Sequence, residues 1–332
     1  MRLVQLQSGT RRAVAVVEEP QLCLLAGVRW VYELAAKAEA GQKSLRDLIR
    51  EGGFASKLDY DTVYAGKSEW RLLPPIDHPA EPARCLVTGT GLTHLGSARN
   101  RQAMHDGNQA ELTDSMKMFR WGVEGGKPPT GRVGIAPEWF YKGCGTILRA
   151  HMEPLEVPAY ADDGGEEGEV AGVYFIGVDG TPWRIGMAIG NEFSDHEFEK
   201  KNYLNLAGSK LRNCSLGPEL VLDPEFQSVT GKVTIERSGQ VLWSQEIVTG
   251  EKEMCHNLAN IEHHHFKFET HRRPGDLHVH YFGACSLSFG AKIRLADGDV
   301  MEIAFTGFGR ALRNPLREAS RQAAPIAVRP MG

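Results

Sequence analysis

The chain has 332 residues, of which 42% are hydrophobic and 24% charged, and its formal net charge is −4. With a sequence pI of about 6.3 it lacks the basic balance that nucleic-acid-binding proteins need. No apolar run reaches the roughly 18 residues of a membrane span, and the N-terminus has no secretory hydrophobic segment. We therefore expect a soluble globular protein of the cytoplasm, with neither nucleic acid nor membrane as a partner.

The six cysteines are scattered along the chain, and none of them forms a Cys-x-x-Cys pair. In a cytoplasmic protein such thiols stay reduced. We expect six free thiols: Cys23, Cys85, Cys144, Cys214, Cys255 and Cys285.

The first part of the chain, residues 1–78, predicts a small α+β domain. Short strands are expected at 2–6 and 12–17, and a helix is expected from Leu45 to Arg50 with Ser44 as its N-cap. A stiff linker follows, because four prolines fall between Leu73 and Pro82, where neither a helix nor a central strand can hold them.

The second part, residues 79–332, is rich in strand signals separated by turn pairs such as Ser238-Gly239. It predicts a large catalytic domain, so the fold class is α+β and β-rich. The expected strands are 170–177, 183–189, 231–237, 241–248, 277–282 and 300–305.

Two carboxylates, Glu167 and Glu169, open one of these strands. Residues i and i+2 of a strand point to the same face, and Glu192 ends the next strand, so pairing of the two strands brings three carboxylates together. Such carboxylates repel one another unless a cation lies between them, and oxygen ligands favour Mg²⁺, with Mn²⁺ or Ca²⁺ as alternatives. The competing interpretation is a solvated acidic loop at 162–169.

Three further patterns carry expectations of their own. Ser194 and Glu197 form a Ser-x-x-Glu capping box, which predicts a short helix from Asp195. The run 263–265 is three histidines, interpreted as lying on a solvated helix, because adjacent helical residues point in different directions. For His278 and His280 we expect buried, hydrogen-bonded positions rather than a zinc site, because no third ligand has suitable spacing.

Several short motifs follow one another along the second part of the chain. They are Glu167-Gly168-Glu169, Asn191-Glu192, Gly208-Ser209-Lys210, Leu216-Gly217-Pro218 and a late segment from Gly307 to Pro315. Their order resembles the catalytic domain of the fumarylacetoacetate hydrolase superfamily, over roughly residues 83 to 316. The similarity is greatest to the 2-keto-3-deoxypentonate (L-arabonate/D-xylonate) dehydratase branch, and it implies a mixed β-sandwich roll, a homodimer and a magnesium site.

The chain also departs from the family's pattern. Ser97 stands where the hydrolases carry the histidine that activates water, and His94 falls where they have tyrosine. A serine hydroxyl is no base at neutral pH, which counts against carbon–carbon bond hydrolysis. Glu192 stands where aspartate is more common, and Lys210 aligns with the family lysine only across a short deletion. Lys142 matches a Phe-Leu-Lys element near the family's pocket, although a surface lysine would give the same sequence.

The resemblance implies metal-dependent dehydration of a 2-keto-3-deoxypentonate, a small 2-keto acid, to 2,5-dioxopentanoate through a stabilised enolate. Lys210 is the preferred base, with Ser97 or His94 assisting the departing hydroxyl, and no organic cofactor is expected. The competing interpretation is that Lys210 forms a purely structural ion pair with one of the acidic residues. Alternatives are an acylpyruvate-type hydrolase, a 2-oxo-acid decarboxylase using the same metal, and a non-catalytic sugar-acid-binding protein.

Overall fold

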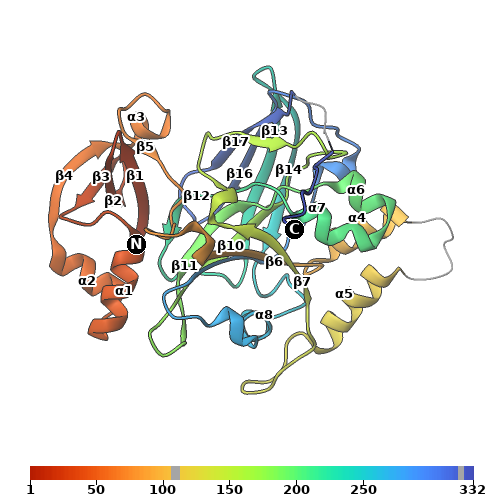
Figure 1. Cartoon of the computed structure of the whole chain (residues 1–332), viewed down its shortest axis with the longest axis horizontal. Coiled ribbons are helices and arrows are strands. Elements are labelled where there is room, and N and C mark those ends of the chain that lie inside the picture. The colour runs from red at the N-terminus through yellow and green to blue at the C-terminus, as the bar shows by residue number, and fades with distance from the viewer. Residues whose placement is uncertain (106–112, 321–324) are drawn as a thin grey trace.

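Two β-sheets organise the protein in the computed structural model, which describes residues 1–105, 113–320 and 325–332 (Figure 1). Within these residues the larger sheet has twelve strands, in the order β4-β3-β2-β1-β12-β11-β10-β15-β6-β7, with β5 added to β1 and β8 to β12. The smaller sheet has five strands in the order β14-β13-β16-β17-β9. The expected β-rich α+β class is confirmed.

The elements of the N-terminal part are β1 (Arg2–Ser8), β2 (Arg11–Glu18), β3 (Gln21–Leu25), α1 (Val31–Gly41), α2 (Leu45–Gly52), β4 (Phe54–Asp59), α3 (Tyr60–Tyr64) and β5 (Arg71–Leu72). The remaining strands are β6 (Cys85–Gly91), β7 (Glu138–Cys144), β8 (Leu148–Arg149), β9 (Leu155–Val157), β10 (Gly168–Ile176), β11 (Pro182–Asn191), β12 (Cys214–Val221), β13 (Val229–Arg237), β14 (Gln240–Thr249), β15 (Leu277–Tyr281), β16 (Val300–Phe305) and β17 (Leu312–Glu318). The remaining helices are α4 (Leu95–His105), α5 (Asp114–Gly125), α6 (His196–Lys201), α7 (Leu206–Lys210) and α8 (Leu258–Phe266).

Strand β10 lies in the middle of the larger sheet and is buried along its whole length. Alternate residues face opposite sides of a strand, and both sides of β10 are covered. Ala171, Val173 and Phe175 join one hydrophobic cluster, whereas Val170 joins another. A strand packed on both faces holds its position firmly, and this fixes the acidic residues at its beginning.

The N-terminal part continues the larger sheet, because β1 pairs with β12 in the register Leu3↔Leu220. It also has a hydrophobic cluster of its own, which includes Val4 and Tyr60. Ser44 caps α2 as expected, since its side chain accepts a hydrogen bond from the backbone N–H of Asp47. The domain boundary near residue 78 stays a prediction.

The late Gly-Phe-Gly-Arg segment binds the N-terminal part to the rest of the chain. The Arg310 guanidinium stacks on Tyr60 at 3.8 Å from the ring centre and forms ion pairs with Glu19 and Asp61. Gly309 has a φ of +87°, and a Cβ there would lie 2.3 Å from the Glu219 side chain. Glycine is therefore required at this turn, because of both its conformation and its close contact.

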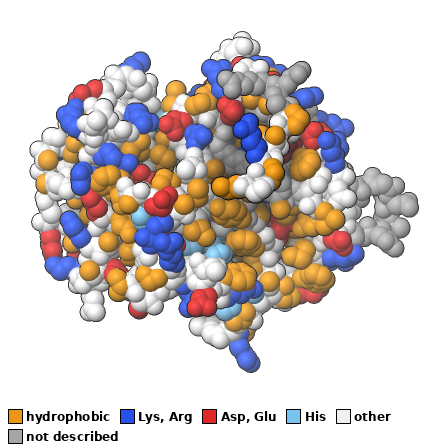
Figure 2. All heavy atoms as spheres, viewed as in Figure 1, with side chains coloured by type: hydrophobic (Ala, Val, Ile, Leu, Met, Phe, Trp, Pro, Cys, Tyr) orange, Lys and Arg blue, Asp and Glu red, His pale blue; other side chains and the backbone are white. Residues whose placement is uncertain are grey.

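The distribution of surface charge and the state of the cysteines agree with what the sequence predicts. Acidic, basic and hydrophobic side chains are interspersed on the face in Figure 2, and such a mixed face gives little electrostatic steering toward a polyanion. All six cysteines are free, as expected. Among the described helices, none is both long and apolar enough to cross a membrane.

The prediction of a solvated helix at 263–265 is confirmed for His263 alone and is wrong for His264 and His265, which are buried where α8 packs on the larger sheet. His265 Nε2 lies 2.9 Å from His278 Nδ1. His280 contacts two threonine hydroxyls of β6, each at 2.7 Å, so the expected buried positions of His278 and His280 are confirmed. Burial lowers the pKa of both to about 3. The prediction fails at His264 and His265 because histidine, a polar residue type, forms part of the buried face of α8.

Buried neutral histidines make the protein sensitive to acid. His151 is an example: burial lowers its pKa from 6.5 to about 4, and its ring contacts the backbone of Tyr64 and Arg313. The folded form resists protonation, so this contribution to stability is fully present above pH 6.5 and is lost as the pH falls from 6.5 toward 4.

We predict that the free energy of unfolding falls between about pH 7 and about pH 5, and that His151→Gln reduces this fall by about 2 kcal/mol. Glutamine keeps a donor and an acceptor but does not titrate. Urea unfolding of both proteins at the two pH values measures the effect. An equal pH dependence in the two proteins would contradict it.

Candidate metal centre

Three glutamates converge in the interior. Carboxylate oxygens of Glu167, Glu169 and Glu192 all lie within 4.8 Å of one another. Their exposed fractions are 7%, 2% and 0%, so the acidic stretch is not a solvated loop. The neighbouring Glu166 is also fully buried, but it accepts hydrogen bonds from the backbone N–H and hydroxyl of Ser288, at 2.7 Å each.

Pairing of β10 with β11 causes this convergence. The two strands are antiparallel in the register Gly168↔Asn191, and the N–H of Glu192 donates to the carbonyl of Glu167 at 2.9 Å. Asn191 Oδ1 in turn accepts from the N–H of Glu167 at 3.1 Å. The pairing of Glu167 with Glu192, together with the i, i+2 relation of Glu167 and Glu169, follows the geometry expected from the sequence.

The three carboxyl groups differ in their electrostatics. Burial raises the pKa of Glu169 well above its usual range, and the charges of Glu192 and Glu167 raise it further. Burial and the Glu167 charge also raise the pKa of Glu192, although Lys142 opposes them. For Glu167 burial acts in the same direction, but Lys210 and His196 outweigh it and hold the pKa well below the usual range. Glu169 is thus the least compensated of the three.

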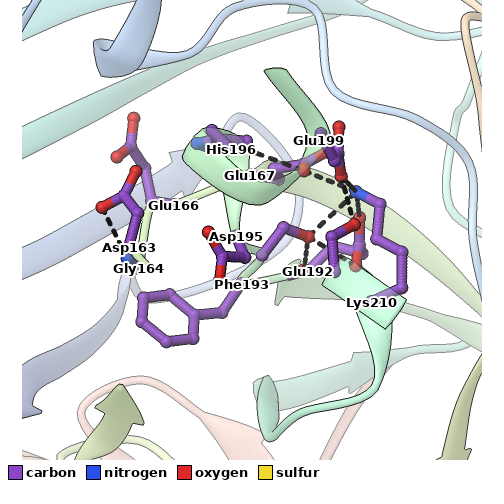
Figure 3. Close-up of polar contacts among 12 residues, drawn as sticks. Asp163, Gly164, Glu166, Glu167, Glu192, Phe193, Asp195, His196, Glu199 and Lys210 are labelled. Carbon is purple, nitrogen blue, oxygen red and sulfur yellow. Dashed lines mark hydrogen bonds and ion pairs between the residues drawn. The ribbon is translucent and has the colours of Figure 1, made fainter. Parts of the chain in front are cut away.

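Two buried lysines approach the cluster, from β7 and from the end of α7. Lys210 Nζ donates to Glu167 Oε1 and to Glu192 Oε2, both at 2.6 Å (Figure 3). Lys142 Nζ donates to Glu192 Oε1 and to the carbonyls of Glu192 and Phe193, at 3.0 and 3.1 Å for the carbonyls. Lys142 is therefore no surface residue. Its only sequence signal is its position in the Phe140-Tyr141-Lys142 element.

The helix after β11 begins one residue later than its sequence predicts. Asp195, not Ser194, is the N-cap of α6, with its side chain accepting from the N–H of Phe198. Ser194 Oγ instead donates to the Glu192 carbonyl at 3.0 Å and accepts from Lys210 at 2.9 Å. His196, which sequence reasoning missed, contacts Glu167 Oε1 at 3.1 Å. Only its position directly after the acidic strand end could have indicated this role.

The segment after β15 supports the third carboxylate, and no sequence motif had pointed to it. The N–H of Gly283 donates to Glu169 Oε2 at 2.7 Å. Gly283 has a φ of +100°, and a Cβ there would lie 2.0 Å from the Thr93 hydroxyl. Only glycine fits this approach of the backbone to the glutamate. Hydrogen bonds of this kind orient the ligands of metal sites.

A small cavity opens beside the glutamates. Its volume of about 20 Å³ has room for a water molecule. The residues lining it are Gly91, Leu92, Ser97, Glu167, Glu199, Lys210, Ala284 and Leu287. The structure thus brings Ser97 and Lys210 to one space. His94 does not line it: its ring nitrogens contact the hydroxyls of Thr93 and Thr249, at 2.9 and 3.1 Å, and burial lowers its pKa to about 4.

Several solved structures of similar shape are named as enzymes. One is 2-keto-3-deoxy-D-arabinonate dehydratase complexed with magnesium and 2,5-dioxopentanoate, with a TM-score of 0.72, 18% identity, and coverage of 97% of this chain and 100% of that one. The chain has the fold of the fumarylacetoacetate hydrolase superfamily. The resemblance in the sequence is confirmed at the level of the fold.

Two other similar structures are isomerases. One is 2-hydroxyhepta-2,4-diene-1,7-dioate isomerase from Mycobacterium marinum, with a TM-score of 0.60, 18% identity, and coverage of 97% of this chain and 100% of that one. The other is 5-carboxymethyl-2-hydroxymuconate delta-isomerase from Mycobacterium smegmatis, with a TM-score of 0.57, 18% identity, and coverage of 96% and 100%. Neither protein-family models nor curated protein sequences give a match.

The donor set fits a hard divalent cation. All three side chains offer carboxylate oxygens, which Mg²⁺, Mn²⁺ and Ca²⁺ prefer. Glu169 adds an independent reason, because the Gly283 N–H and the Lys210 charge only partly offset burial and the two neighbouring carboxylates, and the pKa of Glu169 stays well above its usual range. A cation would remove this repulsion.

We predict that Glu169→Gln binds Mg²⁺ at least ~10-fold more weakly than the wild type, because a neutral amide replaces a charged ligand. Glu166→Gln is the matched control: it is buried three residues away, bonds to Ser288, and lies outside the cluster. Titration calorimetry measures both affinities. Equal Mg²⁺ affinities for Glu169→Gln and the wild type would rule out Glu169 as a ligand.

Proposed function

We propose that this protein is a metal-dependent hydro-lyase that dehydrates a 2-keto-3-deoxypentonate to 2,5-dioxopentanoate. The observation that carries the proposal is the buried cluster of Glu167, Glu169 and Glu192 beside a cavity that Lys210 and Ser97 both line. The similar dehydratase structure, which holds magnesium and 2,5-dioxopentanoate, supports the choice of substrate class and metal.

Each residue has a chemical task in this reaction. The three glutamates would hold the Mg²⁺, which supplies a Lewis acid for the 2-keto group and so makes the C3 proton more acidic. Lys210 lines the cavity and takes that proton. The C4 hydroxyl then leaves as water with a proton from the site, and tautomerisation gives the aldehyde at C5. Ser97 is better placed than His94 to contact the departing hydroxyl, because it lines the same cavity.

The same residues favour dehydration over hydrolysis. Hydrolysis needs a base that activates water, and Ser97 cannot serve as one at neutral pH. His94 is held between Thr93 and Thr249, and its lowered pKa of about 4 makes it a weak base. Dehydration requires only proton removal beside a polarised ketone and help for a leaving hydroxyl.

We predict that the Mg²⁺-loaded protein converts a 2-keto-3-deoxypentonate to 2,5-dioxopentanoate and does not cleave acylpyruvates. An aldehyde-dehydrogenase-coupled assay detects the aldehyde, and an absorbance assay follows acylpyruvate. Lys210→Ala should lose most of kcat while still binding Mg²⁺, because the amine acts in the transition state. Rapid acylpyruvate cleavage without aldehyde from either pentonate epimer would contradict the proposal. Metal and ligand binding without turnover would indicate a sugar-acid-binding protein.

We also propose that the protein is a homodimer. Strand β14 is an edge strand of the smaller sheet among the described residues. The exposed fractions of its residues Val241 and Leu242 are 64% and 41%. An exposed apolar edge strand presents unpaired backbone groups with which a second copy of the chain can pair.

Sedimentation equilibrium at micromolar concentration should then give twice the chain mass of 36.6 kDa. Placing a lysine at position 241, Val241→Lys, should shift the equilibrium toward the monomer, because it places a charge on the strand edge. A single species at the mass of one chain would contradict the dimer.

A further inference from the structure

The Lys210 ammonium lies between two of the three glutamates. It donates to Glu167 Oε1 and Glu192 Oε2 at the same distance of 2.6 Å, and all three side chains are buried (Figure 3). A divalent cation that uses these oxygens as ligands competes with the ammonium for them. In this arrangement the Lys210 ammonium is the counter-charge of these two carboxylates.

Lys142 differs from Lys210 in this respect. It contacts the other oxygen of Glu192, Oε1, and its remaining contacts are the carbonyls of Glu192 and Phe193. These contacts anchor Lys142 at the back of Glu192. It can stay there while Glu192 Oε2 binds a cation, so it supports the site instead of competing for it.

The structure also offers a place for a displaced ammonium. Glu199 lines the same cavity as Lys210, and its Oε1 lies 3.5 Å from Lys210 Nζ. Glu199 is buried, lies outside the cluster of three, and is held by the Ser209 hydroxyl at 2.6 Å. A short movement of Nζ away from Glu167 and Glu192 brings it closer to this carboxylate and to the cavity.

We propose that Lys210 is the resident counter-ion of the metal-free site and that Mg²⁺ must displace its ammonium from Glu167 and Glu192 toward Glu199. Once displaced, the ammonium can pass a proton to the Glu199 carboxylate, and the neutral amine then takes its catalytic position in the cavity only when the metal is bound. The proposal rests on the proposed function for the later role of Lys210, but the displacement itself is measured without turnover.

The test compares Lys210→Met with Lys142→Met, which removes a buried lysine of the same site. Titration calorimetry gives the Mg²⁺ affinity, and thermal unfolding in EDTA and in Mg²⁺ gives the gain in Tm. Lys210→Met should bind Mg²⁺ roughly 10-fold or more tightly than the wild type, because a competing state has been removed. Its Tm should fall in EDTA and rise more on adding Mg²⁺ than that of the wild type.

Lys142→Met should show the opposite change, a weaker affinity for Mg²⁺, because Glu192 loses its anchor. A Lys210→Met protein that folds only with Mg²⁺ also supports the proposal. Mg²⁺ affinity that is unchanged or weaker in folded Lys210→Met overturns it.

Lys210→Arg keeps the test decisive if the methionine variant does not fold under either condition. Arginine is permanently charged and can donate to two carboxylates at once, so it should lower the Mg²⁺ affinity roughly 10-fold or more. An unchanged affinity in that variant overturns the displacement. If the variants show the expected changes in Mg²⁺ affinity but the wild type forms no 2,5-dioxopentanoate, only the proposed dehydratase function is rejected. If the wild type forms this product but the Lys210 variants bind Mg²⁺ as tightly as it does, only the displacement is rejected.

Discussion

Repulsion among three buried carboxylates is the constraint on which the site depends. Taking a carboxylate out of water is strongly unfavourable, and placing three within 4.8 Å adds mutual repulsion. The fold places positively charged side chains and hydrogen-bond donors next to these carboxylates, which reduces their repulsion. Lys210 and Lys142 come from two different elements, His196 begins α6, and the N–H of Gly283 reaches Glu169.

The larger sheet supplies the rigidity that this arrangement needs. Glu169 lies at the start of β10, which is packed on both faces, and Glu167 comes directly before this strand. Glu192 directly follows the hydrogen-bonded neighbour β11. Because backbone pairing fixes the relative position of the two strands, the carboxylates cannot move apart to relieve their repulsion. The groups that are free to adjust are the long side chains around them. Lys210 is the longest of these that borders the cavity, and this makes the cluster responsive to an added cation.

The sequence predicts the frame of this site well and its surroundings poorly. Glu167, Glu169 and Glu192 could be brought together from period-2 alternation and antiparallel pairing, because both are local rules. The residues that support them could not. Lys142 lies 50 positions from Glu192, and Gly283 lies 114 positions from Glu169. Such contacts depend on how β7 and β15 order themselves in the sheet, which no local pattern encodes. The prediction for the buried histidines of α8 fails for a related reason, because polar residues form part of a buried helix face and the sequence gives no sign of it.

The residue at position 97 bears on whether a site of this kind supports elimination or hydrolysis. The carboxylate cluster and the lysine can serve any reaction that passes through an enolate, and the similar structures include both a dehydratase and isomerases. In this chain the group that faces the cavity from the segment after β6 is the Ser97 hydroxyl. This hydroxyl can donate to a leaving group but cannot generate hydroxide. The ring nitrogens of the nearby His94 contact the hydroxyls of Thr93 and Thr249, so this histidine lies in the interior and does not line the cavity. In the proposed reaction, the glutamates would hold the cation that allows an enolate to form, and the Ser97 hydroxyl would favour elimination of water over attack by water.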